Sequence, residues 1–143
     1  MSITLDPRLA DECLVLHASA HGWILLRDEA RFPWCLWVPH SAAVEFHQLS
    51  RSLQQHTLSM VSRLGQLLAA EPGVEKVNVA ALGNIVRQQH WHVIGRHQND
   101  PSWPGPPFGL PRLACPPVLL EARAERIRQG LKCVADPGTP GAP

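Results

Sequence analysis

The longest periodic pattern of hydrophobic positions in the chain predicts an α-helix over residues 51–70. Its apolar residues and one threonine recur at spacings of three and four, which places them on one face of a helix. These positions are Leu53, Thr57, Met60, Val61, Leu64, Leu67 and Leu68. Ser50 or Ser52 can cap the start, and Ser52 with Gln55 fits a capping box. A Pro-Gly pair at 72–73 ends the helix.

Shorter stretches rich in β-branched and aromatic residues predict strands. They cover residues 23–27, 32–38, 74–80 and 88–96. The first two are separated by only four residues, 28–31, so we expect them to form a hairpin. Residues 13–16 form either a short strand or a helical turn, and another helical turn is expected near Glu45. Residues 1–12 predict only a turn at Asp6-Pro7.

The C-terminal part of the chain has a different character. Seven of the seventeen residues from 101 to 117 are proline, so this segment is expected to be extended and to donate few backbone hydrogen bonds. Leu120, Ala124, Ile127 and Leu131 then predict a short helix, with Pro117 near its first turn.

Strands and one long helix in this order predict an α+β domain with an antiparallel sheet. At 143 residues the chain is about one domain long and can bury a substantial core. We expect residues 1–117 to form this domain and residues 118–134 to form its C-terminal helix. Residues 135–143, which contain mainly proline, glycine and alanine, are expected to be a disordered tail.

Composition adds few constraints. Apolar residues make up 45% of the chain and the formal net charge is +1, so no strong field favours a nucleic acid polymer or a membrane surface. No signal peptide is recognisable, and the densest apolar runs are too short to span a bilayer. We therefore expect a cytoplasmic protein whose four cysteines are reduced thiols rather than a disulfide framework.

Two histidines, His90 and His92, stand two apart in the last predicted strand. On a strand this spacing places both imidazoles on one face beside Gln88, while Trp91 and Val93 point toward a core on the other. The spacing alone leaves three interpretations open: a solvated polar face, a zinc site, or a nucleophile for phosphorus. Zinc binds neutral imidazoles but usually takes three or four protein ligands, and no third ligand stands at motif spacing. A neutral imidazole nitrogen can attack phosphorus and carry a covalent intermediate.

The residues around this pair form a longer pattern. A strand containing Lys76-Val77-Asn78-Val79 precedes a Gly83-Asn84 turn, and Gln88-Gln89-His90-Trp91-His92-Val93-Ile94 follows. The pattern resembles the signature of the histidine triad (HIT) superfamily, His-φ-His-φ-His-φ-φ with φ apolar. In that signature Gln88, His90 and His92 take the three His positions in turn.

The resemblance extends to both sides of the motif. Residues 25–28 followed by 32–39 resemble the family's first hairpin, with its acidic residue and its strand that ends in proline. Residues 100–106 resemble a segment of a bacterial branch of the family in which the first His is likewise Gln. The likeness covers roughly residues 22–109.

The resemblance implies a fold, a partner and a reaction. The HIT fold is an antiparallel sheet of about five strands with one long helix, here followed by a short C-terminal helix, and members commonly pair as homodimers. The implied reaction is that of a nucleotide phosphohydrolase or nucleotidyl transferase acting at the α-phosphate. Nucleoside phosphoramidates and dinucleoside polyphosphates are the substrate classes that the resemblance leaves open. No cofactor, metal, nucleic acid polymer or membrane is expected to take part.

The implied catalytic residues are His90, His92 and Gln88. His90 would attack phosphorus and form a nucleotidyl-histidine, with its other ring nitrogen donating to a backbone carbonyl. His92 would hydrogen-bond a phosphate oxygen or the leaving-group oxygen. Gln88 can position groups but cannot transfer protons at neutral pH. This substitution keeps a second interpretation open, a nucleotide-binding module without turnover.

Seven further residues are expected to bind the substrate. Asn78 would contact phosphate or the leaving group, and Asp28 would contact ribose hydroxyls. Asn84 follows Gly83 where the family has Gly-Gln, although this pair also fits an ordinary turn. Phe32 and Trp34 would wall the base pocket. Arg96 would offset phosphate charge unless it is solvated, and Trp103 would close over the site as a lid. These expected substrate-binding residues are Asn78, Asn84, Asp28, Phe32, Trp34, Arg96 and Trp103.

Overall fold

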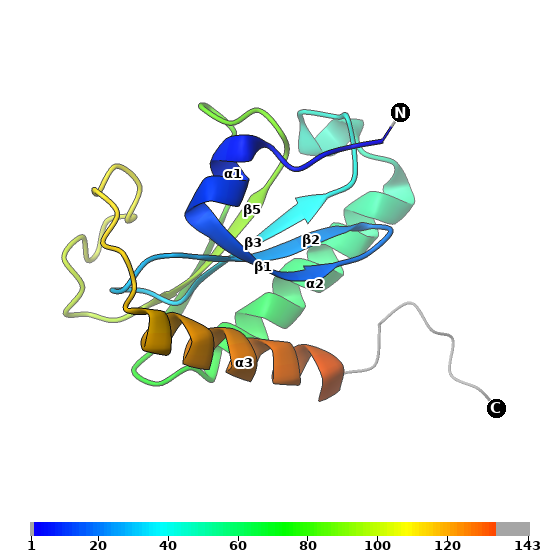
Figure 1. Cartoon of the computed structure of the whole chain (residues 1–143). Coiled ribbons are helices and arrows are strands. Elements are labelled where there is room, and N and C mark those ends of the chain that lie inside the picture. Colours follow the sequence, from blue (N-terminus) through cyan, green and yellow to red (C-terminus); the bar gives the residue numbers. More distant parts are fainter. Residues whose placement is uncertain (1, 134–143) are drawn as a thin grey trace.

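A computed structural model describes residues 2–133, so the expected tail at 135–143 lies outside the described residues. Five antiparallel strands form one sheet in the order β1-β2-β3-β5-β4. The strands are β1 (Cys13–Ala18), β2 (Gly22–Arg27), β3 (Trp34–Pro39), β4 (Lys76–Ala80) and β5 (Trp91–Arg96). The helices are α1 (Pro7–Glu12), η1 (Phe46–Gln48), α2 (Arg51–Ala69) and α3 (Pro117–Cys133). Figure 1 shows the helices around this sheet, and the predicted α+β fold is confirmed.

The long helix α2 follows its predicted pattern, with Thr57 accounting for the one polar position on the buried face. Trp37 Nε1 donates to Thr57 Oγ1 at 3.1 Å, so this hydroxyl is satisfied inside the core. Ser50 is the N-cap and its side chain accepts from Leu53 N. The expected capping box of Ser52 and Gln55 is wrong, because the helix begins one residue before Ser52.

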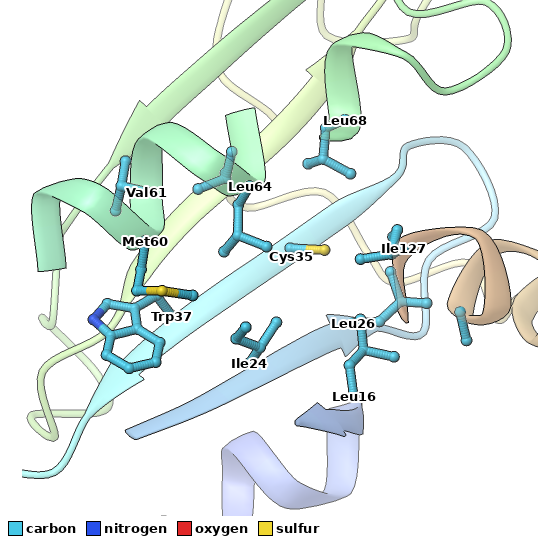
Figure 2. Close-up of a cluster of buried hydrophobic side chains, with 12 residues drawn as sticks. Leu16, Ile24, Leu26, Cys35, Trp37, Met60, Val61, Leu64, Leu68 and Ile127 are labelled. Atoms are coloured by element: carbon cyan, nitrogen blue, oxygen red, sulfur yellow. The ribbon is translucent and has the colours of Figure 1, made fainter. Parts of the chain in front are cut away.

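The sheet separates two hydrophobic clusters, because successive side chains of a strand point to opposite faces. On one face, strand residues such as Ile24 and Trp37 pack against α2 and α3. Figure 2 shows Met60 and Leu64 of α2 pointing toward this cluster, with Ile127 of α3 beside Leu26. All four cysteines are free thiols, as expected, and Cys35 is fully buried in this cluster.

The opposite face carries the second cluster, which α1 covers. It contains Leu9 of α1, Leu25 of β2, Trp34 and Leu36 of β3, and Ile94 of β5. Figure 1 shows α1 and α3 on different sides of the molecule. Trp91 and Val93 of β5 pack with the first cluster and His92 lies on the second face, as the alternation predicts.

The ends of several elements differ from the prediction. Helix α1 was predicted only as a turn; it begins because Asp6 accepts from Arg8 N and proline occupies its first turn. With Leu9 as its single buried residue, it has no periodicity to detect. Strand β5 begins at residue 91 rather than 88, because the ladders with β3 and β4 reach only Trp91 and His92. In the described part of the chain no helix is both long and apolar enough to cross a membrane.

Candidate active site

The orientation of His90 is set by the backbone just before β5. His90 Nδ1 lies 2.7 Å from Gln88 O. Because a carbonyl oxygen can only accept, Nδ1 carries the proton and donates it. The lone pair of the neutral ring is then on Nε2, the nitrogen available for attack. His90 is only 7% exposed, and it still lines a cavity.

His92 has the opposite tautomer. Trp34 Nε1 donates to His92 Nδ1 at 3.0 Å, and both side chains are buried. Since the indole N–H can only donate, Nδ1 must carry the lone pair and Nε2 the proton. Burial, together with the neighbouring His90 and Arg27, lowers the pKa of His92 to about 3. His92 is therefore a neutral hydrogen-bond donor at physiological pH.

Aromatic rings enclose His92. Its ring centroid lies 4.8 Å from that of His90, 5.5 Å from that of Trp34 and 5.0 Å from that of Phe108. The rings meet edge to face, which is a favourable geometry for aromatic pairs. The guanidinium of Arg27 lies over the Trp34 ring at 4.5 Å and forms an ion pair with Glu12 at 2.9 Å. The rings thus form a rigid, largely apolar support with a positive charge at its edge.

A cavity of about 360 Å³ opens in front of both histidines. Its walls come from α1, the ends of β1 and β2, the loop at residues 82–86 and the segment at residues 107–110. Asn84 lines it, in a loop where Gly83 has a φ of 67°, a backbone conformation that favours glycine. The volume is within the range of small-molecule sites.

The Gln88 side chain does not share a strand face with the two histidines. Residues 88–90 precede β5, so the alternation that predicted this placement does not apply to them. The amide accepts from Asp6 N at 2.8 Å and donates to Thr4 O at 2.9 Å. Gln88 thus fixes the N-terminal segment that leads into α1, and its backbone carbonyl orients His90.

The expectation for Arg96 is wrong, because its side chain is fully buried and neither solvated nor turned toward the cavity. It pairs with Asp100 through two hydrogen bonds of 2.6 and 2.8 Å. It also donates to Ser102, to Gly105 O and to Asn78 Oδ1. This ion pair lowers the pKa of Asp100 to about 2. Arg96 therefore anchors the proline-rich segment to β4 and β5.

Five other expected binding residues do not line the cavity. Trp34 is buried behind His92 and donates to its Nδ1, so the expectation that it walls a base pocket is wrong. Asn78 is bonded to Arg96, and Trp103 lies over the Arg96 guanidinium at 5.7 Å. Phe32 is completely buried in the second cluster, so the expectation that it forms a pocket wall is wrong. Asp28 accepts from Arg112 and from Cys115 N, which ties it to the C-terminal part of the chain.

Sequence reasoning missed several cavity residues. Arg27 was detectable, because strand alternation places Leu25 and Arg27 on one face, with Arg27 at the strand end. Arg8 and Glu12 were missed together with α1, and Phe108 was hidden in a segment with no periodicity. Within residues 2–133, no group of three or more His, Cys, Asp or Glu side chains is placed to hold a metal ion.

Comparison with known proteins places this geometry in a family. A family model described as the HIT domain matches residues 10–99. Two crystal structures of bacterial histidine triad proteins are similar over most of both chains. The Bradyrhizobium japonicum protein is 30% identical with a TM-score of 0.86, covering 91% of this chain and 98% of its own. The Marinobacter aquaeolei protein is 33% identical with a TM-score of 0.87, covering 94% and 100%.

A third similar structure comes from Sinorhizobium meliloti. This histidine triad protein is 34% identical with a TM-score of 0.84, covering 89% of this chain and 96% of its own. No curated protein matches the sequence. The solved structures therefore carry the comparison together with the family model.

Proposed function

The chain belongs to the HIT domain family, and we propose that it is a nucleotide phosphohydrolase or nucleotidyl transferase that acts at the α-phosphate. The single observation that carries this proposal is the hydrogen bond from His90 Nδ1 to Gln88 O. It leaves Nε2 as a neutral nucleophile at the edge of a cavity. His90, His92 and Gln88 have separate roles in the proposed reaction.

In the first step His90 Nε2 attacks the α-phosphorus. A P–N bond forms, the bond from phosphorus to the leaving group breaks, and the electron pair departs with the leaving group. His90 then carries the nucleotidyl group with its Nδ1 proton still donated to Gln88 O, which stabilises the positive ring. His92 donates from Nε2 to a nonbridging or bridging oxygen and stabilises charge that develops there.

In the second step water or another acceptor attacks the same phosphorus. The P–N bond breaks, its electron pair returns to His90 Nε2, and the proton of the acceptor passes to solvent. Attack by water makes the protein a hydrolase, and attack by another hydroxyl makes it a transferase. Fixing the nucleophile beside the phosphate converts a bimolecular encounter into a reaction within one complex.

We assign substrate binding to the other cavity residues. Asn84 has an amide at the cavity wall and suits phosphate or leaving-group contacts. Arg27 supplies positive charge, and Trp34 acts behind His92 rather than against the base. The apolar residues Leu36 and Phe108 suit the nucleoside.

Gln88 supports placing the chain in the branch whose first triad position is Gln. Its amide is used by Thr4 and Asp6, so this position helps to build the cavity wall rather than to move protons. The same feature favours a second candidate function, a nucleotide-binding module without turnover. Neither Gln88 nor neutral His92 can supply a proton readily.

We also propose that two copies of the chain form a homodimer, as the family resemblance implies. Strand β4 lies at one edge of the sheet, and Val79 on it is 47% exposed. An edge strand presents unpaired backbone groups that another chain can extend. Light scattering during gel filtration measures the mass, and a monomer at all concentrations contradicts the proposal.

Covalent trapping tests the catalytic proposal. The full chain is mixed with adenosine and guanosine dinucleoside polyphosphates and phosphoramidates, quenched rapidly and measured by intact mass. We expect a mass increase of one nucleoside monophosphate that maps to His90 and is absent in His90→Ala. Nucleotides that raise the melting temperature without adduct or turnover would instead support the binding module.

A further inference from the structure

The bond between Trp34 and His92 has a consequence for which substrates the site can process. Trp34 Nε1 and His92 Nδ1 are 3.0 Å apart, and the exposed fractions of the two residues are 2% and 8%. An indole has one polar hydrogen and no acceptor, so this hydrogen bond has only one possible direction. The lone pair of Nδ1 is therefore occupied in the folded protein.

His92 has no free ring nitrogen that could accept a second proton inside the protein. Such a proton would have to sit on Nδ1, where it would meet the Trp34 N–H directly. Trp34 cannot turn away, because it packs edge to face against Phe32 and Phe108 and lies under Arg27. Protonation of His92 would thus leave two buried donors facing each other, which costs at least the loss of a buried hydrogen bond. The burial that lowers the pKa of His92 acts in the same direction.

Other groups around the cavity do not replace His92 as an acid. Glu12 is the carboxylate partner of Arg27 at 2.9 Å. Burial raises the pKa of the Cys13 thiol to about 12, so it gives up its proton poorly. His90 uses its proton on Gln88 O. The titratable and charged residues that line the cavity are Arg8, Glu12, Cys13, Arg27, His90 and His92.

The missing acid matters because leaving groups differ in basicity. An amine can leave phosphorus only after its nitrogen has gained a proton. A phosphate, acyl or acidic phenolic oxygen can leave with the electron pair as a stable anion. A donor that hydrogen-bonds without giving up its proton, such as neutral His92, helps the second kind of departure but not the first.

We propose that Trp34 holds His92 as a neutral donor and thereby restricts the enzyme to nucleotides whose leaving group departs as an anion, with phosphoanhydrides and aryl phosphodiesters preferred over phosphoramidates. The inference rests on the proposed function, since it concerns the step in which His90 displaces the leaving group. Trp34 acts here as a positioning residue through His92. It selects between the two substrate classes that the family resemblance leaves open.

A leaving-group series tests this preference. Adenosine and guanosine 5′-phosphates are coupled to phenols of graded acidity, to a second nucleotide through an anhydride, and to a primary amine. For the wild type we expect kcat/KM to fall steeply as the phenol becomes more basic. The amidate should react at least about 10²-fold more slowly than the anhydride, the size of one acid contribution.

The variant Trp34→Phe keeps an aromatic ring and removes the N–H. Burial still opposes a charge on His92, but its Nδ1 is then free to take a proton, so the amidate should gain turnover as the pH is lowered. The anhydride-to-amidate ratio at low pH should fall about tenfold or more. Trp23→Phe, the same change at a half-buried indole beside His40, is the control and should leave the ratio unchanged.

Nitrogen-15 NMR of the imidazoles reads the same property without turnover. His92 should keep an unprotonated Nδ1 between pH 5 and 8 in the wild type, and in Trp34→Phe it should take up a proton at a higher pH than in the wild type. A purely structural role for Trp34 would change stability but not this titration. If Trp34→Phe does not fold, the wild-type spectrum and the leaving-group series still test whether His92 is a neutral donor that disfavours amidates.

The possible outcomes distinguish a failure of the leaving-group preference from a failure of the proposed reaction through His90. No nucleotidyl adduct with any substrate overturns both. An adduct on His90 with amidate and anhydride rates within tenfold overturns the inference and leaves the function standing. A wild-type His92 that titrates near neutrality, or a ratio that Trp34→Phe does not change, overturns the role of Trp34.

Discussion

The two ends of β5 carry polar side chains on the same face of the sheet, and they differ in how many polar atoms remain available. At one end, His90 and His92 each have one ring nitrogen bonded within the protein, and both rings line a cavity. At the other end, Arg96 donates to four partners and is completely buried.

This difference teaches how to read polar residues on a strand. Each buried polar group must be paired, because an unpaired one costs free energy. Arg96 satisfies this rule within the chain and so contributes to architecture, while the histidines satisfy it only in part. The Nε2 atoms of His90 and His92 have no partner within this pairing, so they are available to a substrate in the cavity. Four experiments can break or sharpen this contrast.

The largest effect is expected from removing the nucleophile. His90→Ala should lower kcat by a factor on the order of 10³ or more, because no other group at the cavity can form the covalent intermediate. The free energy of unfolding should change by only about 1 kcal/mol, the value of one hydrogen bond. Steady-state kinetics and urea unfolding measure the two quantities. His97→Ala, a half-buried histidine outside the cavity, is the control, and equal losses in both variants would contradict the assignment.

At the Arg96 end of β5 we expect a variant to lose mainly stability rather than turnover. Asp100→Ala leaves the Arg96 charge buried without its partner and should destabilise the fold by about 3–5 kcal/mol. Glu121→Ala breaks an exposed ion pair with Arg128 and should cost less than about 1 kcal/mol. Urea unfolding compares them.

A double variant sharpens the test of this ion pair. Arg96→Met with Asp100→Leu removes both charges and should recover much of the lost stability, because no unpaired charge stays buried. A cost for Asp100→Ala no larger than that for Glu121→Ala would show that Arg96 is not an anchor.

The contrast also explains what could be predicted from the sequence. Helix α2 follows from periodicity, since it buries one regular face. Strands β2, β3 and β5 follow from their content of β-branched and aromatic residues, since the sheet is covered on both faces. Helix α1 did not follow from periodicity, because a single buried residue, Leu9, gives no pattern. Its absence from the prediction hid the part of the cavity wall that α1 provides.

The candidate site was predictable where local spacing decides and not where distant partners do. The pair His90 and His92 was apparent because only one residue separates them at the start of a strand, and their ring centroids lie 4.8 Å apart. The fate of Asp28 depends on Arg112 and Cys115, which lie 84 and 87 positions away. Likewise, nothing local to Trp34 announces that its indole N–H meets His92.

The third experiment measures the free energy of unfolding as a function of pH, which distinguishes the histidine end of β5 from the Arg96 end. Folding holds the pKa of His92 at about 3, below the unfolded value near 6.5, so the unfolded state binds the extra proton first as pH falls. Stability should therefore decrease from pH 6.5 downward, by about 2 kcal/mol at pH 5. His92→Gln cannot titrate and should remove this slope.

The ion pair at the other end responds in a different pH range. The pKa of Asp100 is lowered from 3.8 to about 2, so its contribution is complete above pH 4 and is lost as pH falls toward 2. Asp100→Asn should change the pH dependence only in that range. Urea unfolding at pH 7, 6, 5, 4 and 3 measures both, and a His92→Gln variant with the wild-type slope above pH 4 would contradict the neutral assignment of His92.

The smallest effect is expected from Trp103, which was predicted to close over the site. Its ring lies over the Arg96 guanidinium at 5.7 Å and is 37% exposed, so Trp103→Ala should cost about 1 kcal/mol of stability and leave kcat/KM within about twofold. Phe108→Ala removes a ring 5.0 Å from that of His92 and should reduce kcat/KM by about tenfold or more. The two variants compare two parts of the proline-rich segment: Trp103 packs on the buried Arg96, and Phe108 packs on His92 at the cavity. If Trp103→Ala lowers turnover as much as Phe108→Ala, Trp103 reaches the substrate, and the division between a reactive end and a structural end of β5 fails.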